Sequence, residues 1–271
     1  MELCKSFPLV SVVVPCFNQS RYLTEALDSI LHQTYSFWEC IIVNDGSTDD
    51  TEKIAKAYCS MDERFVYLFQ KNAGLCAARN VGIRKSHGKY ILPLDSDDYI
   101  GEKYLELAIA ALENDEDIKV VYCRAYFFGL KQGEWKLPDY SLERLLGRNC
   151  IFCSAFYRKV DFDKIGGYNI NMKYGFEDWD FWLSLLQEGG KVYRIDDFLF
   201  YYRIRKGSMS RSFNIDKLRY LRRKIWENHI NLYSRHYLDP MECFEYVKVS
   251  DSLEYKLGKI LLSPFRKILT R

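Results

Sequence analysis

The hydrophobic and polar positions of this chain alternate between two periods, which predict strands and helices in turn over its first hundred residues. A continuous, β-branched apolar run at residues 9–16 is typical of a strand buried on both faces. Residues 22–33 place apolar side chains at helical spacing. Further predicted strands lie at 37–43, 65–69 and 89–94, with predicted helices after Ser47 or Thr48 and at 75–85. We therefore predict an α/β fold, a mostly parallel Rossmann-like sheet flanked by helices.

Beyond Tyr99 the pattern is less regular. It predicts helices at 103–113 and 177–188, strands at 120–128, 151–157 and 198–204, a hairpin or loop at 129–140 and a turn at 164–168. From residue 215 the pattern is helical to the end, and we expect Pro264 to interrupt the last helix. The chain is divided accordingly into residues 1–100, residues 101–212 and a helical C-terminal extension, 213–271.

Composition narrows the class of protein. The chain has 271 residues, 48% of them hydrophobic, which suits one large domain or one domain with an appended piece. A net charge of +2 gives no field that would attract nucleic acid. Residues 1–7 do not resemble a signal peptide, and no apolar run reaches the roughly 18 residues of a membrane span. Nine scattered cysteines fit a reducing, cytoplasmic location.

The acidic motif that follows the strand at 89–94 is the first candidate for chemistry. Asp95, Asp97 and Asp98 stand at its end, separated by Ser96. Unpaired buried carboxylates are unfavourable, so these do not serve packing. Carboxyl ends of parallel strands are where open α/β sheets bind ligands. The motif therefore predicts a Mn²⁺ or Mg²⁺ site that carries a diphosphate, with a solvated acidic turn as the alternative.

Two further motifs point to the same edge. Asp45 ends the strand at 37–43 and precedes a glycine; its motif can serve as turn and helix cap, or its carboxylate can accept a hydrogen bond from a nucleobase. Arg79 lies among small residues in the helix at 75–85. A lone arginine there needs an anionic partner, which is either one of the aspartates or a bound phosphate.

A cluster of acidic residues opens the predicted helix at 177–188. Acidic side chains at a helix N-terminus commonly offset the helix dipole. Beside a nucleotide site, Asp178 becomes a candidate general base, with Glu177 in support and Asp180 packed or paired. Trp179 and Trp182 belong either to the core or to a wall that faces a sugar ring.

Taken together, six motifs in order resemble family 2 glycosyltransferases of the GT-A fold. They are PCFNQSRYLTEALDSILHQTY, VNDGSTDDT, NAGLCAARNVGI, LDSDD, IGGY and EDWDFWLSLL, and the resemblance spans about residues 9–210. It implies an inverting transfer from a nucleotide-sugar, most commonly of UDP, to a glycan or lipid-linked acceptor, as in bacterial surface-polysaccharide synthesis, with a divalent cation.

The resemblance also implies roles for single residues. Those of the donor site are backbone at Pro15 to Phe17 and Asp45 at the base, Arg79 at the base or phosphates, Asp95 near the ribose, and Asp97 on the metal. Asp178 would deprotonate the acceptor hydroxyl.

The main departure from the family pattern is Arg205, which stands where many relatives carry histidine. Arginine does not ligate a metal but pairs with phosphate. We expect Arg205 and Lys206, together with Arg203 and Ser208, to form a mobile basic loop over the diphosphate.

The end of the chain, residues 256–271, carries five basic residues, no acid and an apolar face. This composition favours contact with an anionic membrane surface. Packing on the catalytic domain or on a partner chain is the alternative.

Other classes of protein are less compatible with the sequence. An NAD-dependent oxidoreductase needs Gly-x-Gly-x-x-Gly after the first strand, where residues 15–20 contain no glycine, and no P-loop motif occurs. Cys150 and Cys153 have no second cysteine pair and no flanking histidine, which disfavours a zinc site. A nucleotidyltransferase or a non-catalytic glycan- or nucleotide-binding module stays open. We expect acceptor selectivity to lie in residues 124–176, near Trp135.

Overall fold

A computed structural model describes residues 7–205, 214–236, 249 and 251–269, of which 262–269 are described by their backbone alone. The first part alternates strand and helix as the sequence predicts. Its strands are β1 (Val10–Cys16), β2 (Trp38–Asp45), β3 (Phe65–Gln70) and β4 (Tyr90–Pro93), and its helices are α1 (Ser20–Leu31), α2 (Thr51–Met61) and α3 (Leu75–Lys85). Every residue of β1 is buried, which explains why all but Ser11 are apolar.

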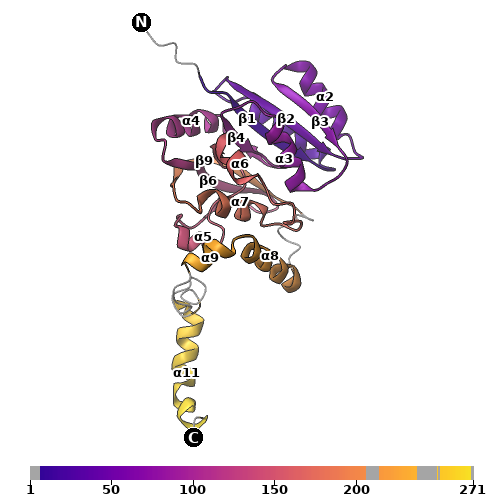
Figure 1. Ribbon diagram of the computed structural model, residues 1–271. Coiled ribbons are helices and arrows are strands. Elements are labelled where there is room, and N and C mark those ends of the chain that lie inside the picture. The colour runs from indigo at the N-terminus through magenta and orange to yellow at the C-terminus, as the bar shows by residue number, and fades with distance from the viewer. Residues whose placement is uncertain (1–6, 206–213, 237–248, 250, 270–271) are drawn as a thin grey trace.

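These four strands form the parallel first half of one nine-stranded sheet, in the order β3-β2-β1-β4. The order continues with β8 (Phe156–Arg158), β6 (Ile118–Gly129), β9 (Lys191–Ile204) and β5 (Tyr99–Ile100), and the ninth strand, β7 (Gly133–Trp135), pairs with β6 off this path. β8 is antiparallel to both β4 and β6. β9 runs parallel to β6, while the short strands β5 and β7 pair antiparallel with β9 and β6. The sheet is thus parallel in its first half and mixed in its second, with helices flanking it (Figure 1).

The second half departs from the sequence prediction in four elements. α4 (Tyr104–Asn114) and α7 (Glu177–Leu186) occur near their predicted positions, but α5 (Leu142–Gly147) and α6 (Lys159–Ile165) were not predicted. β9 begins seven residues before its predicted start, because exposed charged side chains in its first half hide the strand pattern. Residues 151–155 are buried without being a strand, so the strand predicted at 151–157 was wrong in its first part.

The C-terminal helices fall into two groups. α8 (Ile215–Asn228) and α9 (Ile230–His236) hydrogen-bond to α5 and α7, as in the bond from the Tyr233 hydroxyl to the Leu146 carbonyl at 2.7 Å. α11 (Leu253–Leu269) extends away from the body (Figure 1). α11 continues through Pro264, so the predicted interruption was wrong: a proline removes one backbone hydrogen bond, and here the helix tolerates that loss.

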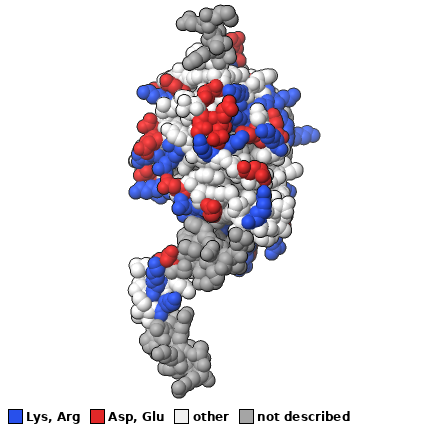
Figure 2. Space-filling model, turned by 60° about the vertical axis from the view of Figure 1, so that its left-hand side comes forward, with Lys and Arg blue, Asp and Glu red and all other residues white. Residues whose placement is uncertain are grey.

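The described surface carries charges of both signs. Figure 2 shows acidic and basic side chains interspersed over the face that it presents. The mixture of charges on this face agrees with the near-neutral net charge of the chain.

Candidate active site at the carboxyl ends of the strands

The acidic motifs meet at one edge because β2, β1 and β4 are neighbours and parallel. Asp45 is the last residue of β2, and Asp95 follows β4 by two residues. β1 lies between them and ends at Cys16. Pro15 is buried inside β1, whereas the Phe17 side chain, just beyond it, is 48% exposed. Phe17 therefore lies at the rim of the edge that carries the aspartates.

Asp45 holds the loop between β3 and α3. Its carboxylate accepts hydrogen bonds from Gln70 Nε2 at 2.6 Å, the Ala73 amide at 2.8 Å and the Gly74 amide at 2.9 Å. Gly46 lets the two loops approach, since a Cβ there would lie 2.7 Å from the Asn72 nitrogen. Asp45 is nearly buried, so one function of this residue is to shape the edge itself.

A buried ion-pair chain crosses the site through Arg79. The guanidinium has no exposed surface and pairs with Asp95 Oδ1 at 2.6 Å and with Glu177 Oε1 at 2.9 Å. Of the two kinds of partner left open by the sequence, the structure supplies carboxylates of the protein. Arg79 therefore presents no atom to a ligand in this conformation and connects α3, the end of β4 and the start of α7.

The turn after β4 is covered by the end of β9. Asp97 Oδ2 accepts a hydrogen bond from Arg205 Nε at 2.6 Å, and Asp98 Oδ1 accepts one from the Arg203 amide at 2.8 Å. Ser96, which precedes Asp97 in the turn, is buried. Burial, together with the charge of Asp95, raises the pKa of Asp97. One partner of Arg205 in this structure is thus the predicted metal ligand, Asp97, while Lys206 and Ser208 lie outside the described residues.

This turn has limited capacity for a metal. Within the described ranges, no three His, Cys, Asp or Glu side chains are grouped so as to hold an ion. Mg²⁺ and Mn²⁺ commonly use only one or two carboxylates and complete their shell with water and substrate phosphate. Asp97 fits that smaller role once Arg205 moves from its carboxylate.

Asp178 lies in the first turn of α7. Phe176, at the N-cap, has a left-handed backbone with φ of 60°, which turns the chain into the helix. Asp178 Oδ2 accepts a hydrogen bond from Asn149 Nδ2 at 2.9 Å, and Oδ1 accepts one from the Trp179 amide at 2.8 Å. Burial, and then the charge of Glu177, raises the pKa of Asp178 to about 7. A carboxyl with this pKa can accept a proton near neutral pH.

Asn149 is a site residue that sequence reasoning missed. It lies in the loop between α5 and β8, and no motif surrounds it. Its role becomes visible only when the fold brings that loop to α7.

Asp180, Trp179 and Trp182 of α7 have partners within the protein. Asp180 is buried and accepts hydrogen bonds from Asn169 at 2.5 Å and Asn228 at 2.7 Å, with a third contact to His229 Nε2 at 3.0 Å. The indole N–H groups of Trp179 and Trp182 donate to backbone carbonyls in the core. Asp180 is therefore paired, as predicted, and the tryptophans belong to the core.

A cavity of about 310 Å³ adjoins this ion-pair chain. The residues that line it are 72–76, Ile170, Met172, Lys173 and Glu177. The start of α3 and the start of α7 thus border one space, with Asp45 holding one wall in place.

Comparison with known proteins identifies the family. The model of glycosyl transferase family 2 matches residues 11–228. The chain belongs to glycosyl transferase family 2. The motifs at Asp45, Asp97 and Asp178 all lie inside the matched segment of this family 2 chain.

Relatives and solved structures agree with the assignment. The chain is 37% identical over 220 residues to glycosyltransferase GlyA of Streptococcus pneumoniae, covering 74% of this chain and 31% of GlyA. It is 30% identical over 222 residues to glycosyltransferase GlyG of the same organism, and the match covers 75% of this chain and 73% of GlyG. Structures of S. aureus TarS 1-349 share the fold: the complex with UDP-GlcNAc has a TM-score of 0.65 at 19% identity, covering 89% of this chain and 80% of that one. The chain spans less than a third of GlyA, the first of these relatives.

Proposed function

We propose that this family 2 chain is an inverting glycosyltransferase that moves a sugar from a UDP-sugar to an acceptor hydroxyl, with Asp178 as general base. The observation that carries the proposal is the environment of Asp178: a carboxyl with its pKa raised to about 7, held by Asn149 beside Glu177. Arg79 forms ion pairs with both Glu177 and Asp95, and Asp95 lies at the carboxyl ends of the strands. These buried ion pairs thus connect the proposed base to the proposed donor site.

The residues act in one displacement. Asp178 accepts the proton of the acceptor hydroxyl as its oxygen attacks the anomeric carbon, while the bond from that carbon to the diphosphate breaks. Asn149 orients the carboxylate. The departing diphosphate keeps its negative charge, so the reaction needs positive charge near it and no protein acid. Two carboxylates that flank the bond, as in glycoside hydrolysis, are not required.

The donor would lie along the edge formed by β1, β2 and β4. Backbone at Pro15 to Phe17 would cover the base, Asp45 would contact it, and Asp95 with Ser96 would face the ribose. Arg79 would act through Asp95 and Glu177, since it is itself buried. The solved TarS structures include complexes with UDP and with UDP-GlcNAc, which supports a UDP donor for this similar fold.

Asp97 would hold a Mn²⁺ or Mg²⁺ ion, whose charge offsets that of the departing diphosphate. Arg205 would leave Asp97 and pair with a phosphate. Its 2.6 Å bond to Asp97 is the contact that must break.

Replacing Arg205 by Gln tests this exchange of partners. We expect the apo protein to bind Mn²⁺ several-fold more tightly, because Asp97 loses its competing cation, while the KM for the donor rises. Paramagnetic titration of Mn²⁺ measures the first effect without turnover. Arg219→Gln, an exposed position on α8, is the matched control. Unchanged Mn²⁺ affinity in Arg205→Gln would refute the exchange.

Turnover tests the proposed activity directly. We expect the protein to release UDP from at least one UDP-sugar, with Mn²⁺ raising the rate. A nucleotidyltransferase would instead release pyrophosphate from a nucleoside triphosphate, and a non-catalytic binding module would bind a nucleotide without releasing any product.

Each of the three predicted segments would have a separate function. Residues 1–100 would hold the donor, residues 101–212 the acceptor, and residues 213–271 would form the extension. The acceptor would be a glycan or a lipid-linked glycan of a surface polysaccharide, and the reaction would take place in the cytoplasm.

α11 would place the enzyme at the inner face of the membrane. Among the residues that the structure describes, no helix is long and apolar enough to cross a membrane. α11 exposes Leu253, Leu257, Ile260 and Leu261, each at least 47% exposed, beside the basic Lys256 and Lys259.

We expect the protein to sediment with vesicles that contain anionic lipid and not with neutral vesicles. Leu257→Glu combined with Ile260→Glu should abolish the sedimentation. Equal sedimentation of this variant would show that α11 makes no membrane contact.

A further inference from the structure

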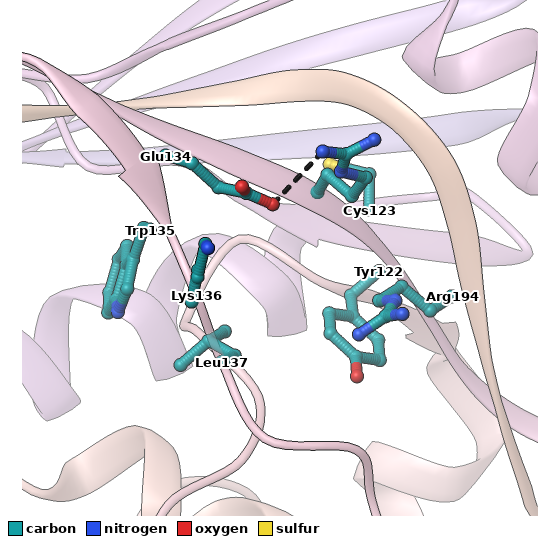
Figure 3. A pocket seen from close by; sticks show the side chains of 8 residues that line it. Tyr122, Cys123, Glu134, Trp135, Lys136, Leu137 and Arg194 are labelled. Atoms are coloured by element: carbon teal, nitrogen blue, oxygen red, sulfur yellow. Dashed lines mark hydrogen bonds and ion pairs between the residues drawn. The ribbon is translucent and has the colours of Figure 1, made fainter.

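A second cavity, separate from the donor edge, opens between β6, β7 and β9 (Figure 3). Its volume is about 190 Å³, roughly the space of six water molecules and so of one sugar-sized group. The side chains that matter chemically are Tyr122, Arg124, Glu134, Trp135, Lys136 and Arg194. Figure 3 shows Lys136 facing Tyr122 and Arg194 across the space.

The aromatic walls of this cavity are held rigidly. Trp135 stacks on Phe127 with ring centroids 5.1 Å apart and contacts Tyr202 at 4.9 Å. Trp135 and Tyr122 both pack against Phe152, at 6.0 Å and 5.8 Å. A fixed aromatic surface suits the apolar C–H face of a sugar or polyol at little entropic cost.

Positive charge predominates among the lining residues, with three cations against the single carboxylate of Glu134. Arg124 pairs with Glu134 at 3.0 Å, and Arg194 pairs with Asp139 at 3.0 Å. The Asp139 side chain is 81% exposed, and ion pairs at the surface contribute only about 0–1 kcal/mol to stability. An anionic group of a ligand can therefore replace Asp139 as the partner of Arg194. No ion pair engages Lys136 in the described part of the chain.

One short loop connects this cavity to the proposed base. Asn149, which donates to Asp178, lies three residues before Phe152, which backs both aromatic walls. The loop that hydrogen-bonds to Asp178 therefore also packs behind the aromatic walls of this cavity.

We propose that this cavity binds an anionic group of the acceptor, a phosphate or a carboxylate attached to a sugar or polyol. The inference rests on the proposed function. Trp135 would pack on the carbon skeleton, and Lys136 and Arg194 would pair with the anion. This subsite would select charged acceptors over neutral ones.

Calorimetric titration, with UDP present in saturating amount to occupy the donor site, tests the proposal. The probes are glucose 1-phosphate, glucuronate and glucose. We expect one of the two charged sugars to bind at least tenfold more tightly than glucose, with affinity falling as salt rises. The better of the two identifies phosphate or carboxylate as the group recognised.

Variants make the test specific. Lys136→Glu and Arg194→Gln should each weaken binding of the charged sugar at least tenfold and leave UDP binding unchanged. Lys85→Glu, an exposed lysine on α3, should change none of these. Equal binding of glucose and the charged sugars, no binding of any, or indifference to both variants would overturn the subsite. Absence of UDP binding and release in the wild type would instead overturn the proposed function.

Discussion

Replacing Asp178 by Asn should lower kcat by about 10²–10⁴-fold, the usual contribution of a general base. Asn keeps the shape of the side chain but does not accept the proton of an attacking hydroxyl. UDP binding should change little, because Asp178 would contact the acceptor and not the nucleotide. Single-turnover rates and UDP affinity, measured on the same preparation, separate the two effects.

The pH dependence gives a second measure of the same residue. Because the pKa of Asp178 is about 7, log(kcat/KM) should fall with unit slope below that pH and level off above it. Asp163→Asn, on the exposed surface of α6, is the matched control. A variant at Asp178 that retained more than half of the wild-type rate would remove this residue from the mechanism.

Stability should change in the opposite direction from activity. Folding raises the pKa of Asp178 from 3.8 to about 7, so the folded state holds a proton that the unfolded chain has lost over that range. Stability contributed by this group is therefore lost as pH rises from about 4 to about 7. Asp178→Asn removes the loss, and its Tm should exceed that of the wild type by several degrees at pH 8 and by little at pH 4.

Replacing Arg79 by Met should lower the free energy of unfolding by about 3–5 kcal/mol, because it leaves Asp95 and Glu177 without their shared cation. At about 2–4 °C per kcal/mol for a chain of this size, Tm should fall on the order of 10 °C. Arg84→Met, in the same helix but exposed, should change the free energy of unfolding by less than about 1 kcal/mol.

A double-mutant cycle assigns the effect of Arg79 to the ion pairs. Adding Glu177→Gln to Arg79→Met removes one of the uncompensated carboxylates, so the double variant should be more stable than Arg79→Met alone. If the losses of unfolding free energy in the two single variants simply add, the uncompensated carboxylates do not destabilise Arg79→Met. The buried ion pairs would then not couple α3 to α7.

The sequence predicted the first half of the fold because β1, β2 and β4 are buried on both faces, and α1 and α2 are buried on one face. That same regularity located the donor edge: Asp45 and Asp95 end parallel strands, so sharing an edge follows from topology. β9 was only half predicted, since five of its first seven residues are exposed and four of the seven are charged, so they show no hydrophobic alternation. The short helices α5 and α6 carry too few turns for a periodic signal.

The missing parts of the site depend on contacts between distant residues. The sequence required an anion for Arg79 but did not choose between protein and ligand, and Glu177 lies 98 residues away. The bond between Arg205 and Asp97 spans 108 residues, and Asn149 reaches Asp178 from a loop without a motif. These pairs form because β9 and the loop before β8 fold over the carboxyl ends of the strands. The local sequence pattern does not predict that arrangement.

The measurement that tests the central claim most directly is a thermal-shift titration with UDP, GDP, dTDP and CMP, each with and without Mn²⁺. A nucleotide at a hundred times its Kd stabilises the folded state by about 2.7 kcal/mol. We predict a rise in Tm of several degrees with UDP, larger with Mn²⁺, and loss of the Mn²⁺-dependent part in Asp97→Asn. No shift with any of the four nucleotides would contradict a nucleotide-sugar site at the edge of β1, β2 and β4.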